Sequence, residues 1–180
     1  GDQYVLNGTK RFITNAPSAD ILTVMARTNA EIDGAGGVSS FIVERDSPGL
    51  SFGKPEKKMG QQGAHVCDVI FEDCRVPIEN IVGAEGDGFT IAMKGLDGGR
   101  LNIGACSIGG ARACLDASRN YLKERQQFGQ PLADFQALQF RLADMATELE
   151  SARLMIHRGA WMLDNNGHGT TVAAAMAKRI

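Results

Sequence analysis

The spacing of apolar residues changes near residue 87, and this change constrains the fold more than any other feature of the sequence. Before it, short segments rich in alternating and β-branched residues are bounded by Gly, Asn, Asp and Pro, which is typical of strands and turns. From Gly88 onward the apolar residues recur every three or four positions, as on one face of a helix. The sequence therefore predicts an α+β chain, with an antiparallel β-sandwich or barrel over residues 1–86 and an up-down helical bundle over residues 87–180.

Short strands are predicted in the first part, between turn-forming residues. Asn7-Gly8 supplies the positive φ that a type I′ turn requires, so residues 4–6 and 9–14 are expected to form a hairpin. Further strands are expected at residues 21–27, 38–44, 50–52 and 66–71.

Two long helices and the start of a third are predicted in the second part. The apolar face of the first helix is expected to contain Leu101, Ile108, Ala111, Leu115 and Leu122. The apolar face of the second is expected to contain Leu138, Leu142, Met145, Leu149, Ala152 and Ile156. Residues 127–131 contain Gly129 and Pro131 and must be non-helical, residues 164–169 end the second helix, and a third helix begins near Thr170.

Composition excludes two classes of partner. The 19 Lys and Arg residues stand against 21 Asp and Glu residues, so no basic surface is available for nucleic acid or an anionic membrane. No apolar run approaches the roughly 18 to 20 residues that span a bilayer. We therefore expect neither nucleic acid nor a membrane as a partner.

Residue chemistry alone predicts no catalytic site. The four cysteines lie seven or more residues apart and the chain has only three histidines, so no metal site is expected. No phosphate-binding glycine loop and no nucleophile motif is present.

Six segments, taken in order, resemble landmarks of the acyl-CoA dehydrogenase family. They are residues 4–10 (YVLNGTK), 12–15 (FITN), 69–77 (VIFEDCRVP), 86–89 (GDGF), 99–100 (GR) and 125–132 (RQQFGQPL). The resemblance covers essentially the whole chain. It implies a β-barrel-like middle domain followed by the first helices of a four-helix bundle, which agrees with the change near residue 87.

The resemblance implies FAD as the cofactor. Phe12, Ile13 and Thr14 match the family's segment along the isoalloxazine ring, where the family more often has Trp at the position of Phe12. The Thr14 position hydrogen-bonds near the flavin N5 edge. Taken alone, Phe12 also fits a buried aromatic residue of a β-hairpin.

Three later residues match positions near the other end of the cofactor. Arg125 matches an arginine that reaches the FAD pyrophosphate across a subunit interface, and its planar fork suits phosphate oxygens. Phe128 and Gln136 match positions near the adenosine side. Taken alone, Arg125 also fits a cation favoured at a helix C-terminus. The assignment requires a homo-oligomer, and tetramers are common in the family.

The acyl-CoA substrate is assigned to Asp97, Gly98, Gly99 and Arg100, which match the stretch lining the family's substrate cavity. Arg100 is expected to structure this site and Asp97 to make a polar contact with the CoA moiety. Alternatively, Asp97 is a turn residue between two helical pieces.

The family's reaction removes the α-proton of an acyl thioester while the β-hydride passes to the flavin, which requires a carboxylate base. Some members carry this base as a Glu at the position of Gly99, and others carry it in a segment that would lie beyond Ile180. Because glycine has no side chain, we expect the distal location and no catalytic residue in this chain.

Further matches at residues 57–60, 95–103 and 142–147 resemble most closely the members that act on the branched isobutyryl group. Electrons are then expected to pass to an electron-transfer flavoprotein. The alternatives are an acyl-CoA or nitroalkane oxidase of the same fold, or an inactive structural fragment.

The chain is expected to be part of a longer protein, because Gly1 is not Met and Ile180 lies in a helical run. The expected compartment is the cytoplasm in a bacterium and the mitochondrial matrix in a eukaryote.

Overall fold

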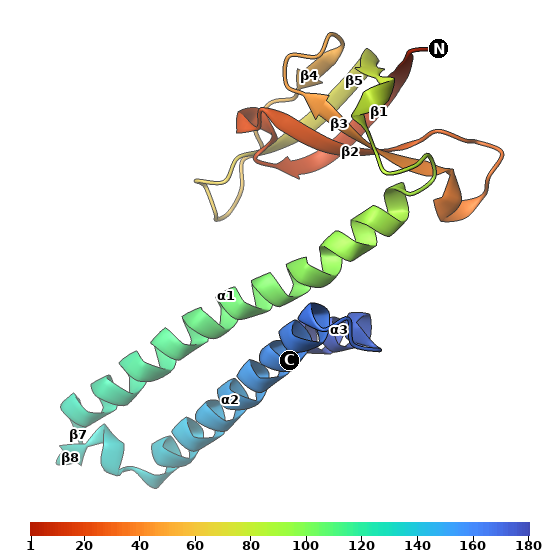
Figure 1. The fold of residues 1–180 in the computed structure, drawn as a ribbon. Helices are drawn as coiled ribbons and strands as arrows, with labels where there is room; N and C mark the ends of the chain where they lie inside the picture. The colour runs from red at the N-terminus through yellow and green to blue at the C-terminus, as the bar shows by residue number, and fades with distance from the viewer. The chain divides into compact units, whose positions relative to one another are not determined.

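Two structural units follow one another in the computed structural model, which describes residues 1–180 (Figure 1). The first unit, Gly1–Ala92, contains the strands β1 (Gln3–Thr14), β2 (Ile21–Arg27), β3 (Val38–Glu44), β4 (Leu50–Phe52), β5 (Val66–Pro77) and β6 (Ile81–Val82). The second unit, Met93–Ile180, contains most of α1 (Gly88–Glu124), then β7 (Gln126–Gln127), β8 (Gln130–Pro131), α2 (Gln136–Asp164) and α3 (Thr170–Arg179). No helix combines the length and the apolar character needed to cross a bilayer.

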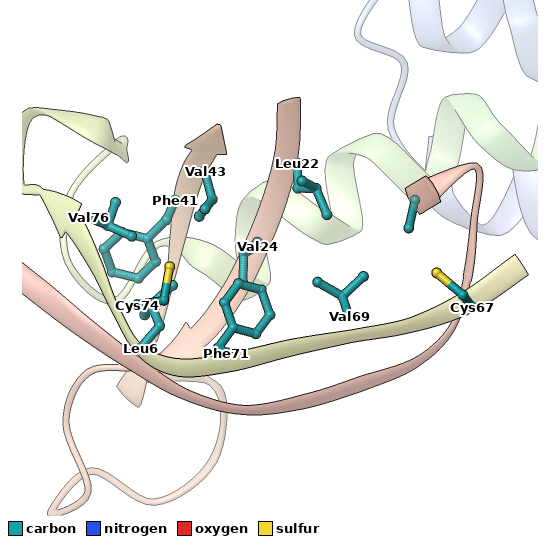
Figure 2. Packing of buried hydrophobic residues seen from close by; sticks show 11 residues of the cluster. Leu6, Leu22, Val24, Phe41, Val43, Cys67, Val69, Phe71, Cys74 and Val76 are labelled. Atoms are coloured by element: carbon teal, nitrogen blue, oxygen red, sulfur yellow. The ribbon is translucent and has the colours of Figure 1, made fainter. Parts of the chain in front are cut away.

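The six strands of the first unit form two antiparallel sheets, with strand orders β1-β5-β4 and β2-β3-β6. Alternate residues of the strands point inward, because successive side chains of a strand lie on opposite faces. Figure 2 shows the resulting core, which contains Leu6, Leu22, Val24, Phe41, Val43, Cys67, Val69, Phe71, Cys74 and Val76. The predicted α+β class and the antiparallel sandwich are confirmed, and the sheets do not close into a barrel.

The predicted hairpin at Asn7-Gly8 is wrong. Both residues lie inside the single strand β1, opposite an irregularity at which Leu6 pairs with Cys74 and Gly8 with Phe71. The extra residue therefore belongs to β5, where Asp73 has φ 50°. The Asn7 side chain donates to Asp73 Oδ1 at 3.0 Å and accepts from the Asp73 backbone N–H at 2.8 Å. Asn7 thus stabilises a β-bulge in the neighbouring strand rather than a turn in its own.

The helices of the second unit follow the predicted pattern. Leu101 of α1 and Ile156 of α2 are buried with Ala174 and Ala177 of α3, and the other predicted apolar positions of α2 are half-buried. Close approach is possible because Gly159 carries no side chain: a Cβ there would lie 2.7 Å from Leu101 Cδ2. Helix α1 runs without interruption through residues 97–100. The alternative that Asp97 is a turn between two helical pieces is therefore wrong.

Candidate functional site

The first group of predicted site residues lies at the end of β1. The register between β1 and β5 shifts between Lys10 and Ile13, and Phe12 adopts φ 57°. This conformation is uncommon for an aromatic residue, and a bulge redirects the side chains around it. Phe12 is 64% exposed, and Thr14 is also exposed. The alternative of a buried aromatic residue is therefore wrong, and the end of the strand carries an exposed aromatic ring and, two residues further on, an exposed hydroxyl group.

Arg11 supports Phe12, and the sequence analysis missed it. The guanidinium carbon of Arg11 lies 5.0 Å from the centroid of the Phe12 ring, which is within the range of a cation–π interaction. Its Nε donates to Asp68 Oδ1 of β5 at 3.4 Å, and its Nη2 lies 4.0 Å from Glu56 Oε1. Only the pairing of β1 with β5 brings Asp68 next to Arg11, so the sequence carried no local signal for this contact.

The second group surrounds the hairpin between α1 and α2. Strands β7 and β8 pair across Phe128-Gly129, and both turn residues have positive φ (53° and 82°), as type I′ turns require. The predicted non-helical segment is therefore confirmed. Phe128 is 93% exposed, and its ring packs edge-on against Phe135 at 6.2 Å between centroids.

Arg125 and Gln136 flank this hairpin. Arg125 directly follows the last residue of α1, and its backbone carbonyl accepts a hydrogen bond from Leu132 N at 2.8 Å. Its side chain is exposed and takes part in none of the ion pairs of the chain. Gln136 is the exposed first residue of α2. The connection between α1 and α2 thus carries the exposed Phe128 ring, the unpaired Arg125 guanidinium and the exposed Gln136 amide.

The third group lies in the first half of α1. Arg100 Nη1 donates to Asp97 Oδ1 at 2.5 Å, and Thr171 Oγ1, at the start of α3, donates to Asp97 Oδ2 at 2.7 Å. Both carboxylate oxygens of Asp97 are therefore engaged. Gly98 and Gly99 leave the helix surface beside this pair open, since a Cβ at either position would meet no heavy atom within 4 Å.

The second and third groups are far apart in one copy of the chain. Arg125 follows Asp97 by 28 residues, and nearly all of them belong to α1. At about 1.5 Å per residue this corresponds to roughly 42 Å, more than the diameter of a small domain. One copy of the second unit therefore cannot bring Arg125 and Asp97 to the same small ligand.

The residues present fit a flavin dinucleotide in their chemistry. An exposed aromatic ring with a neighbouring hydroxyl suits the edge of a planar ring system, and an unpaired guanidinium suits a pyrophosphate. None of these groups is needed for the internal packing of the chain, because all of them are exposed.

Comparison with known proteins identifies the family. The model of the acyl-CoA dehydrogenase middle domain matches residues 1–74, and that of the acyl-CoA dehydrogenase C-terminal domain matches residues 86–180. The chain belongs to the acyl-CoA dehydrogenase family. Members of this family are FAD-dependent oxidoreductases.

Individual relatives cover nearly the whole chain. A mitochondrial isobutyryl-CoA dehydrogenase of Dictyostelium discoideum is 53% identical over 99% of this chain and 42% of its own length. The caffeyl-CoA reductase-Etf complex subunit CarC of Acetobacterium woodii is 48% identical over 99% of this chain and 46% of its own. The structure of butyryl-CoA dehydrogenase from Megasphaera elsdenii is 44% identical, with a TM-score of 0.92 over 98% of this chain and 46% of that one. The expected similarity to the isobutyryl members is confirmed, and the chain spans less than half the length of these relatives.

Proposed function

We propose that the whole protein is an FAD-dependent dehydrogenase that converts a short branched acyl-CoA to the 2-enoyl-CoA. The observation that carries this proposal is the 53% identity to an isobutyryl-CoA dehydrogenase over 99% of the chain. Electrons would pass on to an electron-transfer flavoprotein, which the similarity to a subunit of an Etf complex supports.

The reaction divides the two hydrogens of the acyl chain. The α-hydrogen leaves as a proton to a carboxylate base, and the β-hydrogen leaves with its electron pair as a hydride, so that a C=C bond forms. Bound FAD would supply the two-electron acceptor for this hydride. In this chain, Phe12, Ile13 and Thr14 would lie along the flavin ring, and Arg125 would bind the pyrophosphate through two parallel hydrogen bonds.

The catalytic base is assigned to a segment outside residues 1–180. Gly99 has no side chain, and Asp97 already accepts hydrogen bonds from Arg100 and Thr171 with its two oxygens. A base must reach the substrate proton, whereas these two hydrogen bonds hold the Asp97 carboxylate against Arg100 and Thr171. We therefore assign Asp97 and Arg100, with Gly98 and Gly99 between them, to the lining of the acyl-CoA site and not to proton transfer.

A homo-oligomer completes this assignment. Since Arg125 and Asp97 are separated by roughly 42 Å along α1, Arg125, Phe128 and Gln136 would act on the cofactor of a neighbouring subunit. We propose the tetramer that is common in the family. The proposed compartment is the mitochondrial matrix for a eukaryotic source and the cytoplasm for a bacterial one.

Flavin retention tests the assignment of Arg125. Arg125→Ala in the whole protein is expected to raise the Kd for FAD at least about tenfold, because a charged pyrophosphate contact is lost, and therefore to lower the flavin-to-protein absorbance ratio after gel filtration. Lys123→Ala, which removes a nearby exposed cation from the last turn of α1, serves as the matched control and should retain FAD. Equal flavin occupancy in the two variants would remove Arg125 from the site.

Reoxidation separates the dehydrogenase from an oxidase of the same fold. After reduction by substrate, a dehydrogenase is expected to reoxidise slowly in air and rapidly with an electron-transfer flavoprotein. Rapid reoxidation by oxygen alone, with peroxide released, would assign the protein to the oxidases.

A further inference from the structure

Thr171 makes a contact that no other hydroxyl group in α1, α2 or α3 makes. Its Oγ1 donates to Oδ2 of Asp97 on α1 at 2.7 Å, across 74 residues of sequence. A hydroxyl group inside a helix commonly donates to a carbonyl one turn earlier in the same helix. The hydroxyl groups of Ser107, Thr147 and Ser151 do so. The hydroxyl group of Thr171 is instead bonded to a side chain of another helix.

Apolar packing holds the start of α3 close to Asp97. Ala174 and Ala177 of α3 are buried in one cluster with Leu101, which follows Asp97 by one turn of α1. A Cβ at Gly104, in the next turn of α1, would lie 3.6 Å from the carbonyl oxygen of Ala177. Because α3 rests on this part of α1, its first turn stays within hydrogen-bond distance of the Asp97 carboxylate.

Partners from two helices fix the Asp97 carboxylate. Thr171 of α3 donates to Oδ2, and Nη1 of Arg100 on α1 donates to Oδ1 at 2.5 Å. The first turn of a helix also favours an anion, because its free N–H groups point toward it. The side chain of Asp97 is only 15% exposed, so little water competes for its oxygens. The carboxylate therefore cannot rotate without losing one of two hydrogen bonds.

Arg100 keeps N–H donors for a ligand. A guanidinium carries several donors in one plane, and Arg100 makes a single hydrogen bond in the chain, to Asp97. Its side chain is 28% exposed, and the neighbouring Gly99 leaves the helix surface beside it open. The direction of the remaining donors is therefore set by Asp97 and, through Asp97, by Thr171.

We propose that Thr171 is a positioning residue of the acyl-CoA site, which holds the Asp97 carboxylate so that Arg100 presents its free donors to the acyl-CoA in one orientation. Thr171 itself makes no contact with the substrate in this assignment. A donor that is already oriented loses less conformational entropy on binding, so the Thr171 hydroxyl group strengthens acyl-CoA binding. The inference rests on the proposed function, which places Asp97 and Arg100 in the acyl-CoA site.

Steady-state kinetics of the whole protein with isobutyryl-CoA test this role. Thr171→Val keeps the shape of the side chain without its hydroxyl group, and Thr171→Ala removes the group with a gain in helix propensity. Both variants are expected to raise the KM about tenfold with kcat within about twofold, because ground state and transition state lose the same contact. Thr171→Ser keeps the hydroxyl group and should keep the KM within about twofold. An unchanged KM in the variants without the hydroxyl group would overturn the proposal.

Thr170→Val is the matched control. Oγ1 of Thr170 lies 2.5 Å from the carbonyl oxygen of Gly167 and 3.2 Å from that of Met162, and it does not contact Asp97. This variant therefore removes a hydroxyl group from the start of α3 and leaves the Asp97 carboxylate held. We expect a lower Tm and a KM within about twofold of the original. A KM raised as much as in Thr171→Val would assign the effect to the stability of α3 and overturn the proposal.

A double variant tests whether Thr171 acts through Asp97. Once Asp97→Ala has removed the carboxylate, the Thr171 hydroxyl group has no acceptor on α1. The double variant Asp97→Ala with Thr171→Val should therefore have a KM within about twofold of that of Asp97→Ala alone. Effects that multiply in the double variant would show that Thr171 acts independently of Asp97, and would overturn the proposal.

The unsubstituted protein separates the two possible failures. If neither isobutyryl-CoA nor another short acyl-CoA reduces its flavin, the proposed function fails and this inference fails with it. If the flavin is reduced and Thr171→Val keeps the original KM, only the inference fails and the acyl-CoA site stands.

Discussion

The two units have nearly equal lengths but enclose very different cores. In Gly1–Ala92, the two sheets bury a cluster of eleven residues between them. In Met93–Ile180, the buried cluster contains four residues. Open grooves of about 390 and 460 Å³ remain along α1 and α2, and the first is also bordered by α3. Strands that share two packed sheets enclose a core by themselves, whereas long helices in a thin layer leave faces for another segment or subunit.

The largest contrast is expected from truncation of core side chains. Phe41 is fully buried and packs edge-on against Tyr4, so Phe41→Ala should lower the free energy of unfolding by about 3–5 kcal/mol. Leu115→Ala, in a half-buried groove wall of α1, should cost only about 1–2 kcal/mol, since the exposed part is already in water. Urea unfolding followed by circular dichroism measures both, with Trp161 fluorescence reporting the helical unit. Equal costs would remove the distinction between the two cores.

Thiol labelling should separate the units by reaction rate. Cys67 and Cys74 are fully buried in the sandwich, and burial raises the pKa of both thiols. Cys106 and Cys114 are exposed on α1. At pH 8 and low denaturant, we expect the α1 thiols to react with iodoacetamide at least about 100-fold faster, because the buried thiols require opening of the sandwich. Mass spectrometry of labelled peptides measures the rates, and similar rates would show that the sandwich opens readily.

Alanine substitution of helical glycines tests the one closely packed region of the helical unit. Gly109→Ala meets no neighbour and should raise the free energy of unfolding by about 0.5–1 kcal/mol through helix propensity. Gly159→Ala would press a Cβ against the buried Leu101. This variant should lower the free energy of unfolding by about 1 kcal/mol, since the cost of overpacking exceeds the gain in helix propensity. Thermal unfolding of both variants gives the comparison. Stabilisation by both would mean that α2 is free to move away from α1.

The smallest effect concerns an ion pair on α2. Arg153 donates two hydrogen bonds to Glu150, from Nε to Oε2 at 2.8 Å and from Nη2 to Oε1 at 2.6 Å. These hydrogen bonds lower the pKa of the Glu150 carboxyl. A lowered folded-state pKa contributes stability that is present above the unfolded value and lost as pH falls through the folded value. Glu150→Gln should therefore lower the Tm slightly at pH 7 and have less effect below about pH 4. Glu148→Gln is the control, because Glu148 takes part in no ion pair. If Glu150→Gln lowered the Tm by the same amount at low pH as at pH 7, the account would be contradicted.

Local patterns predicted much of the fold. The bounds of β2, β3 and β4 follow from alternation between turn residues, and the three helices follow from the spacing of their apolar residues. The hairpin prediction at Asn7-Gly8 was wrong because this residue pair is equally compatible with a turn and with a β-bulge. Only the register with β5, which lies far along the sequence, distinguishes the two.

The candidate site residues could be predicted mainly from the family resemblance and much less from the chemistry of the residues themselves. Arg125 and Phe128 were identified by their place in a recognisable segment, since exposed residues carry no periodic signal. Arg11 and Thr171 were missed because their partners lie 57 and 74 residues away in the sequence. Such contacts depend on tertiary structure and have no local pattern.

The central claim is that the protein holds a flavin that accepts hydride from a short branched acyl-CoA. The most direct measurement is the visible spectrum of the whole protein, purified without added cofactor, before and after anaerobic addition of isobutyryl-CoA. We predict a flavin band near roughly 450 nm that bleaches on addition. A band that persists with isobutyryl-CoA would contradict the substrate, and the absence of any flavin band would contradict the proposed function as a whole.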